Sequence, residues 1–256
     1  MVSTRNHPRQ FPPPELATPS KSSPTKSPSK SSSPSDNVVV RRSASKTTGW
    51  SHTPSTLTLV WLAISLPLVS WDTGYLLMRP HTMPGGKFHW PVWAPYKLYG
   101  TVDRLYGFPG WQSNNGFVGA QAFMNLLETA AYLVYLYIVY TAGVSSHVQG
   151  TGAPDKSIVG RLAEARVLTG RAAAIAVTIG FGASVATVAK TLLYVLNDAF
   201  SGFSWTGHND LFTLLTIYII PNGQWLIFPV YMTYVFASEL LDGLEAASTG
   251  ALKKAQ

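Results

Sequence analysis

Four long apolar segments constrain the fold of this chain more than any other feature of its sequence. They cover residues 56–78, 116–142, 169–196 and 211–236. At a rise of about 1.5 Å per residue, each segment is long enough as a helix to cross a hydrocarbon layer about 30 Å thick. Water-soluble proteins do not repeat such segments four times in one chain. The sequence therefore predicts an all-α, polytopic membrane bundle of about four transmembrane helices.

The charge distribution supports a membrane protein and argues against a nucleic-acid partner. The chain has 256 residues and a net charge of +7, but only 12% of its residues are charged, about half of the ~25% typical of soluble domains. Residues 1–50 hold eight Lys or Arg against two acidic residues, so that +6 of the +7 belongs to this stretch. Residues 51–256 are almost neutral and offer no basic domain that would suit nucleic acid.

The N-terminal stretch has the composition of a disordered segment. Residues 1–50 contain 12 Ser and 8 of the 18 Pro of the chain, without a periodic apolar pattern. Such a segment cannot bury enough apolar surface to offset the conformational entropy lost on folding. We therefore predict a disordered Ser/Pro/Lys-rich tail over 1–52, a transmembrane domain over 53–245 and a C-terminal tail over 246–256.

Lys and Arg counts predict the orientation of the bundle. An even number of spans puts both termini on one side, which then holds 14 Lys or Arg against four on the opposite side. Because basic flanks favour the cytosol, we expect a multi-pass protein with both termini cytosolic. The last four residues include Lys253 and Lys254 and match a dilysine retrieval signal, which favours the endoplasmic reticulum membrane. A solvated basic tail is the alternative for these two lysines.

Three ionisable residues within the predicted spans mark the first place to look for function. Asp72, Glu128 and Lys190 are costly in hydrocarbon unless they face a partner or a cavity. Two interpretations remain open. Lys190 pairs with one of the carboxylates as a structural bridge, or a carboxylate left unpaired in apolar surroundings acts as a proton donor.

Polar and aromatic residues recur at helical spacing in all four spans, which places them on one face of each helix. These faces cannot point at lipid, so we predict an amphipathic pocket on the bundle axis that opens toward the outer leaflet or the lateral bilayer. The four stripes consist of Trp61, Ser65, Leu68, Asp72 and Tyr75; Gln121, Asn125, Glu128, Tyr132 and Tyr135; Thr187, Lys190 and Tyr194; and Tyr218, Asn222, Trp225 and Pro229.

The loop over 79–115 is rich in Trp, Tyr, Gly and Pro, and rings of this amphipathic type settle at the level of lipid headgroups. We expect it to lie on the membrane as a lid, with an aromatic anchoring belt as the alternative. The chain has no Cys, and its six His are scattered. We therefore expect no metal centre, and no motif indicates a cofactor.

Three short islands of sequence carry a resemblance to a known family. Glu128 lies within NLLETAAYLVYLY, Asn222 and Trp225 lie within NGQWLIFP, and Asp72 lies near the end of the first span. Over roughly 56–245 this set resembles the EXPERA-domain family of endoplasmic-reticulum proteins. The family includes emopamil-binding protein, which is a sterol Δ8–Δ7 isomerase, and the sigma-2 receptor.

The resemblance implies a sterol or related lipid in an intramembrane pocket, and an isomerase of the emopamil-binding-protein type. In that isomerase, the glutamate of the second span and the acidic group of the first perform proton transfer on the sterol B ring. Glu128 and Asp72 are therefore the catalytic candidates. Together with the stripes, the resemblance gives as ligand-binding candidates Asn125, Tyr132, Lys190, Tyr194, Tyr218, Asn222 and Trp225.

Two alternatives to an isomerase stay open. The isomerase has a histidine one turn before the acidic residue of its first span, where this chain has Leu68. A non-catalytic sterol or lipid receptor or chaperone of the sigma-2 type would instead use Asp72 and Glu128 to bind a polar or cationic group. A small transporter is the third hypothesis, although no internal repeat supports it. The expected partners are the ligand and the bilayer, and a homodimer stays open.

Overall fold

The long helices of the computed structural model begin and end close to the apolar segments of the sequence. The structure describes residues 49–145 and 164–255, except for the side chains of 251–255. The predicted N-terminal tail lies almost wholly outside these residues. The first three spans are the helices α1 (Thr56–Leu77), α4 (Phe117–Ala142) and α6 (Gly170–Phe200). The fourth span consists of three consecutive helical segments, α7 (Leu211–Thr213), η1 (Leu214–Ile219) and α8 (Ile220–Ala255).

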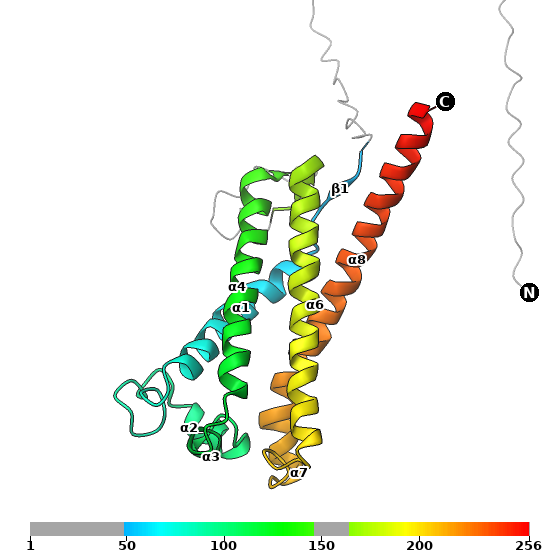
Figure 1. The fold of residues 1–256 in the computed structure, drawn as a ribbon. Coiled ribbons are helices and arrows are strands. Elements are labelled where there is room, and N and C mark those ends of the chain that lie inside the picture. The colour runs from blue at the N-terminus through cyan, green and yellow to red at the C-terminus, as the bar shows by residue number, and fades with distance from the viewer. Residues whose placement is uncertain (1–48, 146–163, 256) are drawn as a thin grey trace, which may run out of the picture. The chain divides into compact units, whose positions relative to one another are not determined.

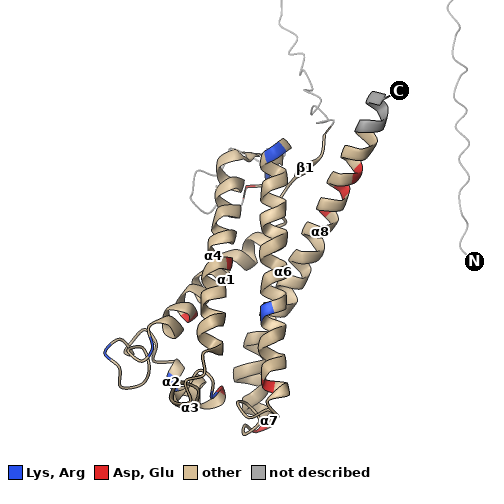
Figure 2. Ribbon diagram, in the orientation of Figure 1, with Lys and Arg blue, Asp and Glu red and all other residues tan. Residues whose placement is uncertain are grey.

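Within the described part of the chain, four helices are long and apolar enough to cross a membrane. Helix α6 packs against α4 on one side and α8 on the other, while α1 packs against α4 (Figure 1). Lys, Arg, Asp and Glu are sparse along these four helices (Figure 2). The all-α bundle predicted from the sequence is confirmed, and the chain has the architecture of a multi-pass membrane protein.

The fourth span begins at Leu211 as predicted but differs from the prediction in its length and in the kind of helix near its beginning. The helix continues to Ala255, well beyond the predicted end at residue 236, so the predicted C-terminal tail is helical over its described residues. After α7 the span contains a π-helical segment, η1, at whose end the Ile220 N–H donates to the Leu215 carbonyl. Pro221 follows directly, and because proline has no N–H to donate, the wider turn accommodates the missing α-helical bond. Pro67 and Pro229 lie inside α1 and α8.

A small antiparallel sheet closes one end of the bundle, which we call the inner end. Strands β1 (Ser51–His52) and β2 (Val144–Ser145) both pair with β3 (Arg166–Thr169). His52 is 1% exposed and its Nδ1 pairs with Glu239 of α8. The Trp50 indole also donates to the Glu239 carbonyl, at 3.0 Å. These contacts attach the segment before α1 to the last helix.

The opposite, outer end is covered by a folded cap made of residues 79–115 and 201–210. The cap contains α2 (Tyr96–Val102) and α3 (Phe108–Gln112). Its own core includes Leu105, which is fully buried. Asn209 donates from Nδ2 to the Val102 carbonyl at 2.8 Å, which joins the two loops. The predicted lid therefore has a defined fold on the end of the bundle, while its contact with the membrane stays a prediction.

Gly180 of α6 lies directly against the Phe236 ring of α8. A Cβ placed on this residue would lie 2.6–2.9 Å from three ring atoms of Phe236, which is 1% exposed. Small residues at such positions let two membrane helices pack with their backbones close together. The absence of a side chain at Gly180 is therefore a requirement of the bundle.

We predict that Gly180→Ala lowers the free energy of unfolding by about 1–3 kcal/mol, because the added methyl group overlaps the Phe236 ring. Gly182 supplies the matched control, since it lies in the same helix with nothing within 4 Å of a Cβ. Gly182→Ala should be neutral or stabilise by about 0.5–1 kcal/mol through helix propensity. Thermal unfolding in detergent measures both, and equal shifts would contradict the close approach.

Candidate functional site

The polar stripe of the second span forms the buried face of α4. Each of its five members is at most 9% exposed, and these are Gln121, Asn125, Glu128, Tyr132 and Tyr135. In the first span, Trp61, Ser65 and Tyr75 are buried as expected. Leu68 is 44% exposed, so this member of the predicted stripe faces away from the bundle. The position at which the resemblance places a histidine is therefore on the outside of α1.

Glu128 forms a buried ion pair with Lys190 of α6. Lys190 Nζ lies 2.8 Å from Glu128 Oε2, and the two side chains are 9% and 7% exposed. The same ammonium donates to Asn125 Oδ1. The Thr187 hydroxyl lies 3.0 Å from Glu128 Oε2, and Tyr132 OH lies 3.3 Å from that hydroxyl. The structural bridge considered from the sequence is therefore formed, and Glu128 is the carboxylate that takes part.

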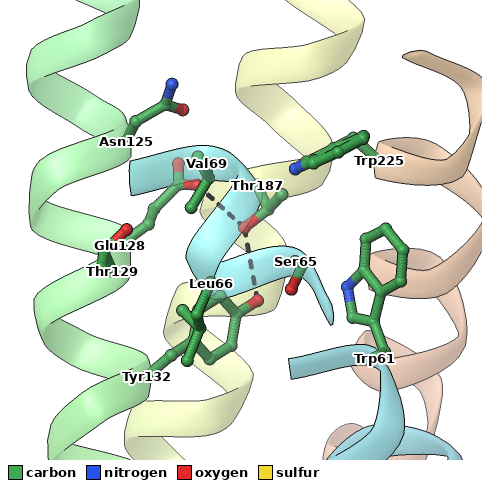
Figure 3. A pocket seen from close by; sticks show the side chains of 10 residues that line it. All are labelled: Trp61, Ser65, Leu66, Val69, Asn125, Glu128, Thr129, Tyr132, Thr187 and Trp225. Carbon is green, nitrogen blue, oxygen red and sulfur yellow. Dashed lines mark hydrogen bonds between the residues drawn. The ribbon is translucent and has the colours of Figure 1, made fainter. Parts of the chain in front are cut away.

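The second oxygen of Glu128 is left without a partner. Glu128 Oε1 is buried and accepts no hydrogen bond from the described residues. The side chain lines a cavity of about 20 Å³, which is room for about one water molecule. The lining residues come from all four spans (Figure 3) and are Trp61, Ser65, Leu66, Val69, Asn125, Glu128, Thr129, Tyr132, Thr187 and Trp225. Because an unpaired buried acceptor is costly, a hydrogen-bond donor at this point is favourable.

Aromatic rings form the other side of this cavity. Figure 3 shows Trp61 and Trp225 across from Glu128. Their ring centroids are 5.4 Å apart in an edge-on arrangement, and Trp61 also stacks on Phe228 at 4.3 Å. Trp61 belongs to α1, whereas Trp225 and Phe228 belong to α8. The cavity thus offers a carboxylate oxygen on one side and electron-rich faces on the other, which suits a polar or cationic group on an apolar body.

Asp72 does not line this cavity. Tyr96 OH donates to Asp72 Oδ1 at 2.6 Å and Tyr106 OH to Oδ2 at 3.2 Å. Both tyrosines belong to the outer cap. The two catalytic candidates, Asp72 and Glu128, therefore occupy separate polar clusters in this structure.

The remaining candidates divide between these two clusters. Asn125, Tyr132, Lys190 and Trp225 belong with Glu128, through the contacts and lining described above. Tyr194, Tyr218 and Asn222 belong to the outer cluster instead, because they contact the cap or each other. Asn222 Nδ2 donates to Tyr99 OH at 3.1 Å and to the Tyr218 carbonyl at 2.8 Å. The side chains of Lys253 and Lys254 lie outside the described residues.

Asp103 is a buried acid that the sequence did not single out. It is fully buried in the cap, where Oδ1 accepts from the Leu105 N–H at 3.0 Å and Oδ2 accepts from Tyr194 OH. Burial raises the pKa of this carboxyl from 3.8 to about 7, and these hydrogen bonds oppose the rise. Burial also raises the pKa of Tyr99 and Tyr106, so both hydroxyls stay protonated near neutral pH. Asp103 escaped prediction because it follows no apolar periodicity.

We predict that Lys190→Met lowers the free energy of unfolding by about 3–5 kcal/mol, because the Glu128 carboxylate is left buried without its counter-charge. The double variant Glu128→Gln/Lys190→Met should recover much of this loss. Leu193→Met, at a half-exposed position of the same helix, is the control for the new side chain. Thermal unfolding in detergent gives the values. If the double variant were as unstable as Lys190→Met alone, Glu128 and Lys190 would not be energetically coupled.

We also predict that the cap loses stability as the pH rises from about 4 to 7. In this window folded Asp103 retains a proton that the unfolded chain has released, so the free energy of unfolding falls with pH and levels off above 7. The change has an upper limit of roughly 4 kcal/mol. Asp103→Asn should flatten the profile, whereas Asp242→Asn, at an exposed position of α8, should not. Unfolding midpoints at a series of pH values check this, and identical slopes for wild type and Asp103→Asn would refute it.

Two further findings complete the description of the site. Among residues 49–145 and 164–255, no group of three or more His, Asp or Glu side chains is arranged to hold a metal ion. Comparisons of the chain with protein-family models, with curated proteins and with solved structures find no match. The functional argument therefore starts from the residues themselves, with the unpaired oxygen of Glu128 at its centre.

Proposed function

We propose that this chain binds a sterol or a related lipid within the membrane, in a site beside Glu128. The observation that carries the proposal is the unpaired Oε1 of this buried carboxylate, at a cavity whose other side consists of two indoles. A sterol offers one hydroxyl on a large apolar body. The hydroxyl supplies the donor that Oε1 lacks, and the rings supply apolar surface for Trp61 and Trp225.

The resemblance to the EXPERA-domain family supports the sterol class of ligand. Two of its three islands reach the cavity, since Glu128 and Trp225 both line it. A different polar lipid would satisfy the same geometry, because the cavity selects a donor and an apolar body. The sterol is therefore the specific part of the proposal and takes its support from the resemblance.

Binding requires the cavity to enlarge. A volume of about 20 Å³ is far below the roughly 300–1,000 Å³ of sites that hold drug-sized ligands. Helix α1 packs mainly on α4, and α8 packs mainly on α6. The aromatic contacts of Trp61 with Trp225 and Phe228 therefore close a seam between α1 and α8. We infer that a lipid enters laterally when this seam opens.

Two forms of the function differ in their chemistry. An isomerase must protonate one ring carbon and deprotonate another, which calls for titratable groups that both reach the substrate. A receptor or chaperone needs only the acceptor and the apolar wall. The hydrogen bonds from Tyr96 and Tyr106 to Asp72 favour the receptor form, because they hold the second acid outside the cavity beside Glu128.

We further propose that the protein belongs to the endoplasmic reticulum membrane, with both termini in the cytosol. The excess of Lys and Arg on the side of the termini supports this orientation. The pair Lys253 and Lys254 resembles a dilysine retrieval signal, which supports the compartment.

The binding site is tested with a photoreactive sterol on the full-length protein in lipid nanodiscs. Ser65→Phe should abolish labelling because Ser65 is 6% exposed and lines the cavity, while Ile64→Phe, on the half-exposed face of the same helix, should retain it. Mass spectrometry should place the label on peptides of α1, α4 or α8 beside the cavity. Undiminished labelling of Ser65→Phe, or a label confined to the outer cap, would overturn the proposal.

The two forms of the function are separated by sterol profiling in an isomerase-deficient strain. In the isomerase form, the wild-type chain restores conversion of Δ8 to Δ7 sterols and Glu128→Gln does not. In the receptor form, the sterol ratios stay unchanged although the photoreactive sterol still binds. If the wild-type chain neither binds the photoreactive sterol nor restores conversion, both forms of the function are rejected.

A further inference from the structure

A second cavity lies in the outer cap, and the proposed sterol site does not use it. Its volume is about 420 Å³, within the range of small-molecule sites. It is lined by α2, α3 and neighbouring cap residues, with Tyr75 from the end of α1. The cavity is therefore already formed in this structure, unlike the small space beside Glu128.

The edge of this outer cavity carries two unpaired cations. Lys97 and Arg104 both line it, both are exposed, and neither side chain has a hydrogen bond or ion pair with a described residue. His208 lines the cavity as well, and its Nε2 lies 2.7 Å from the Thr101 carbonyl. No carboxylate is present among the described residues of the lining. The cavity therefore favours an anion.

Apolar rings complete the lining. Tyr75 and Tyr96 stack with ring centroids 3.8 Å apart, and Phe108 lies at the same cavity. Tyr75 lies two residues before the end of α1, which places the cavity at the end of a membrane span, where lipid headgroups meet water. Leu98, which follows Lys97 in α2, is 58% exposed, as expected for a surface at the membrane interface. The lining of the outer cavity therefore suits a ligand that joins a negatively charged headgroup to an apolar body.

We propose that the outer cavity binds a membrane lipid with an anionic phosphate headgroup. Arg104 and Lys97 pair with the phosphate oxygens, and the guanidinium suits two such oxygens at once. The first carbons of the lipid tails lie mainly against Phe108, which is 43% exposed at this cavity. This site goes beyond the proposed sterol function, since it selects negative charge, whereas the unpaired Glu128 oxygen selects a donor.

Isothermal titration of the full-length protein in detergent tests the proposal with three probes. These are dihexanoyl phosphatidic acid, dihexanoyl phosphatidylcholine and inorganic phosphate. The phosphatidic acid should bind, and its affinity should fall as salt is added. The phosphatidylcholine, with equal tails and no net charge, should bind at least tenfold more weakly. Inorganic phosphate should also bind more weakly, because it lacks the apolar body.

The variant Lys97→Gln/Arg104→Gln should weaken the binding of phosphatidic acid at least tenfold without changing the unfolding midpoint. Lys87→Gln is the matched control, because Lys87 is a cap lysine that lies over the Phe88 ring, 4.7 Å from its centroid, and does not line the cavity. Thr101→Trp, which fills the cavity without removing a charge, should abolish binding.

Equal affinities for the two lipids, or wild-type affinity in the double variant, would overturn the proposal. Phosphate binding as tight as that of phosphatidic acid would show a free-anion site instead of a lipid site. Sterol labelling beside Glu128 should be unaffected, so the two proposals fail independently.

Discussion

The ion pair between Glu128 and Lys190 is the interaction on which the rest of the bundle depends. A carboxylate or an ammonium alone at this depth would be costly, and the pair removes that cost only if α4 and α6 present the two groups to each other. This requirement fixes the rotation of both helices. The polar stripe of α4 then faces inward, and Gly180 of α6 faces α8, where it allows the close approach of Phe236.

The same pair explains why the bundle contains a buried acceptor without a partner among the described residues. Lys190 and Thr187 both contact Oε2 of Glu128, so the charge is balanced from one side and Oε1 is left free. If Lys190 and Thr187 had contacted one oxygen each, both oxygens of Glu128 would have been paired and neither would have been available to a ligand. Glu128 lines the cavity between the four spans, and the aromatic contacts of Trp61 close the α1–α8 side of that cavity.

The spans and the buried stripe of α4 could be predicted from the sequence, because apolar length and helical spacing are local properties. The division of the polar residues into two clusters could not. Asp72 has the spacing of its stripe, but its partners Tyr96 and Tyr106 come from a loop whose fold depends on tertiary packing. Asp103 has no periodic signal at all. Leu68 follows the spacing and is nevertheless exposed, one residue after Pro67, which disturbs the regular helical bonding of α1.

The outer cap connects the outer cavity with Asp72. Tyr96 donates to Asp72 and also lines the outer cavity, and Tyr75 stacks on the same ring. An occupant of that cavity therefore touches the residue that holds Asp72 in place. If Asp72 takes part in proton transfer, Tyr96 and Tyr106 must first release it, and the cap must move. If both proposals hold, a lipid that fixes the cap opposes this release, and occupancy of the outer cavity then favours sterol binding over catalysis.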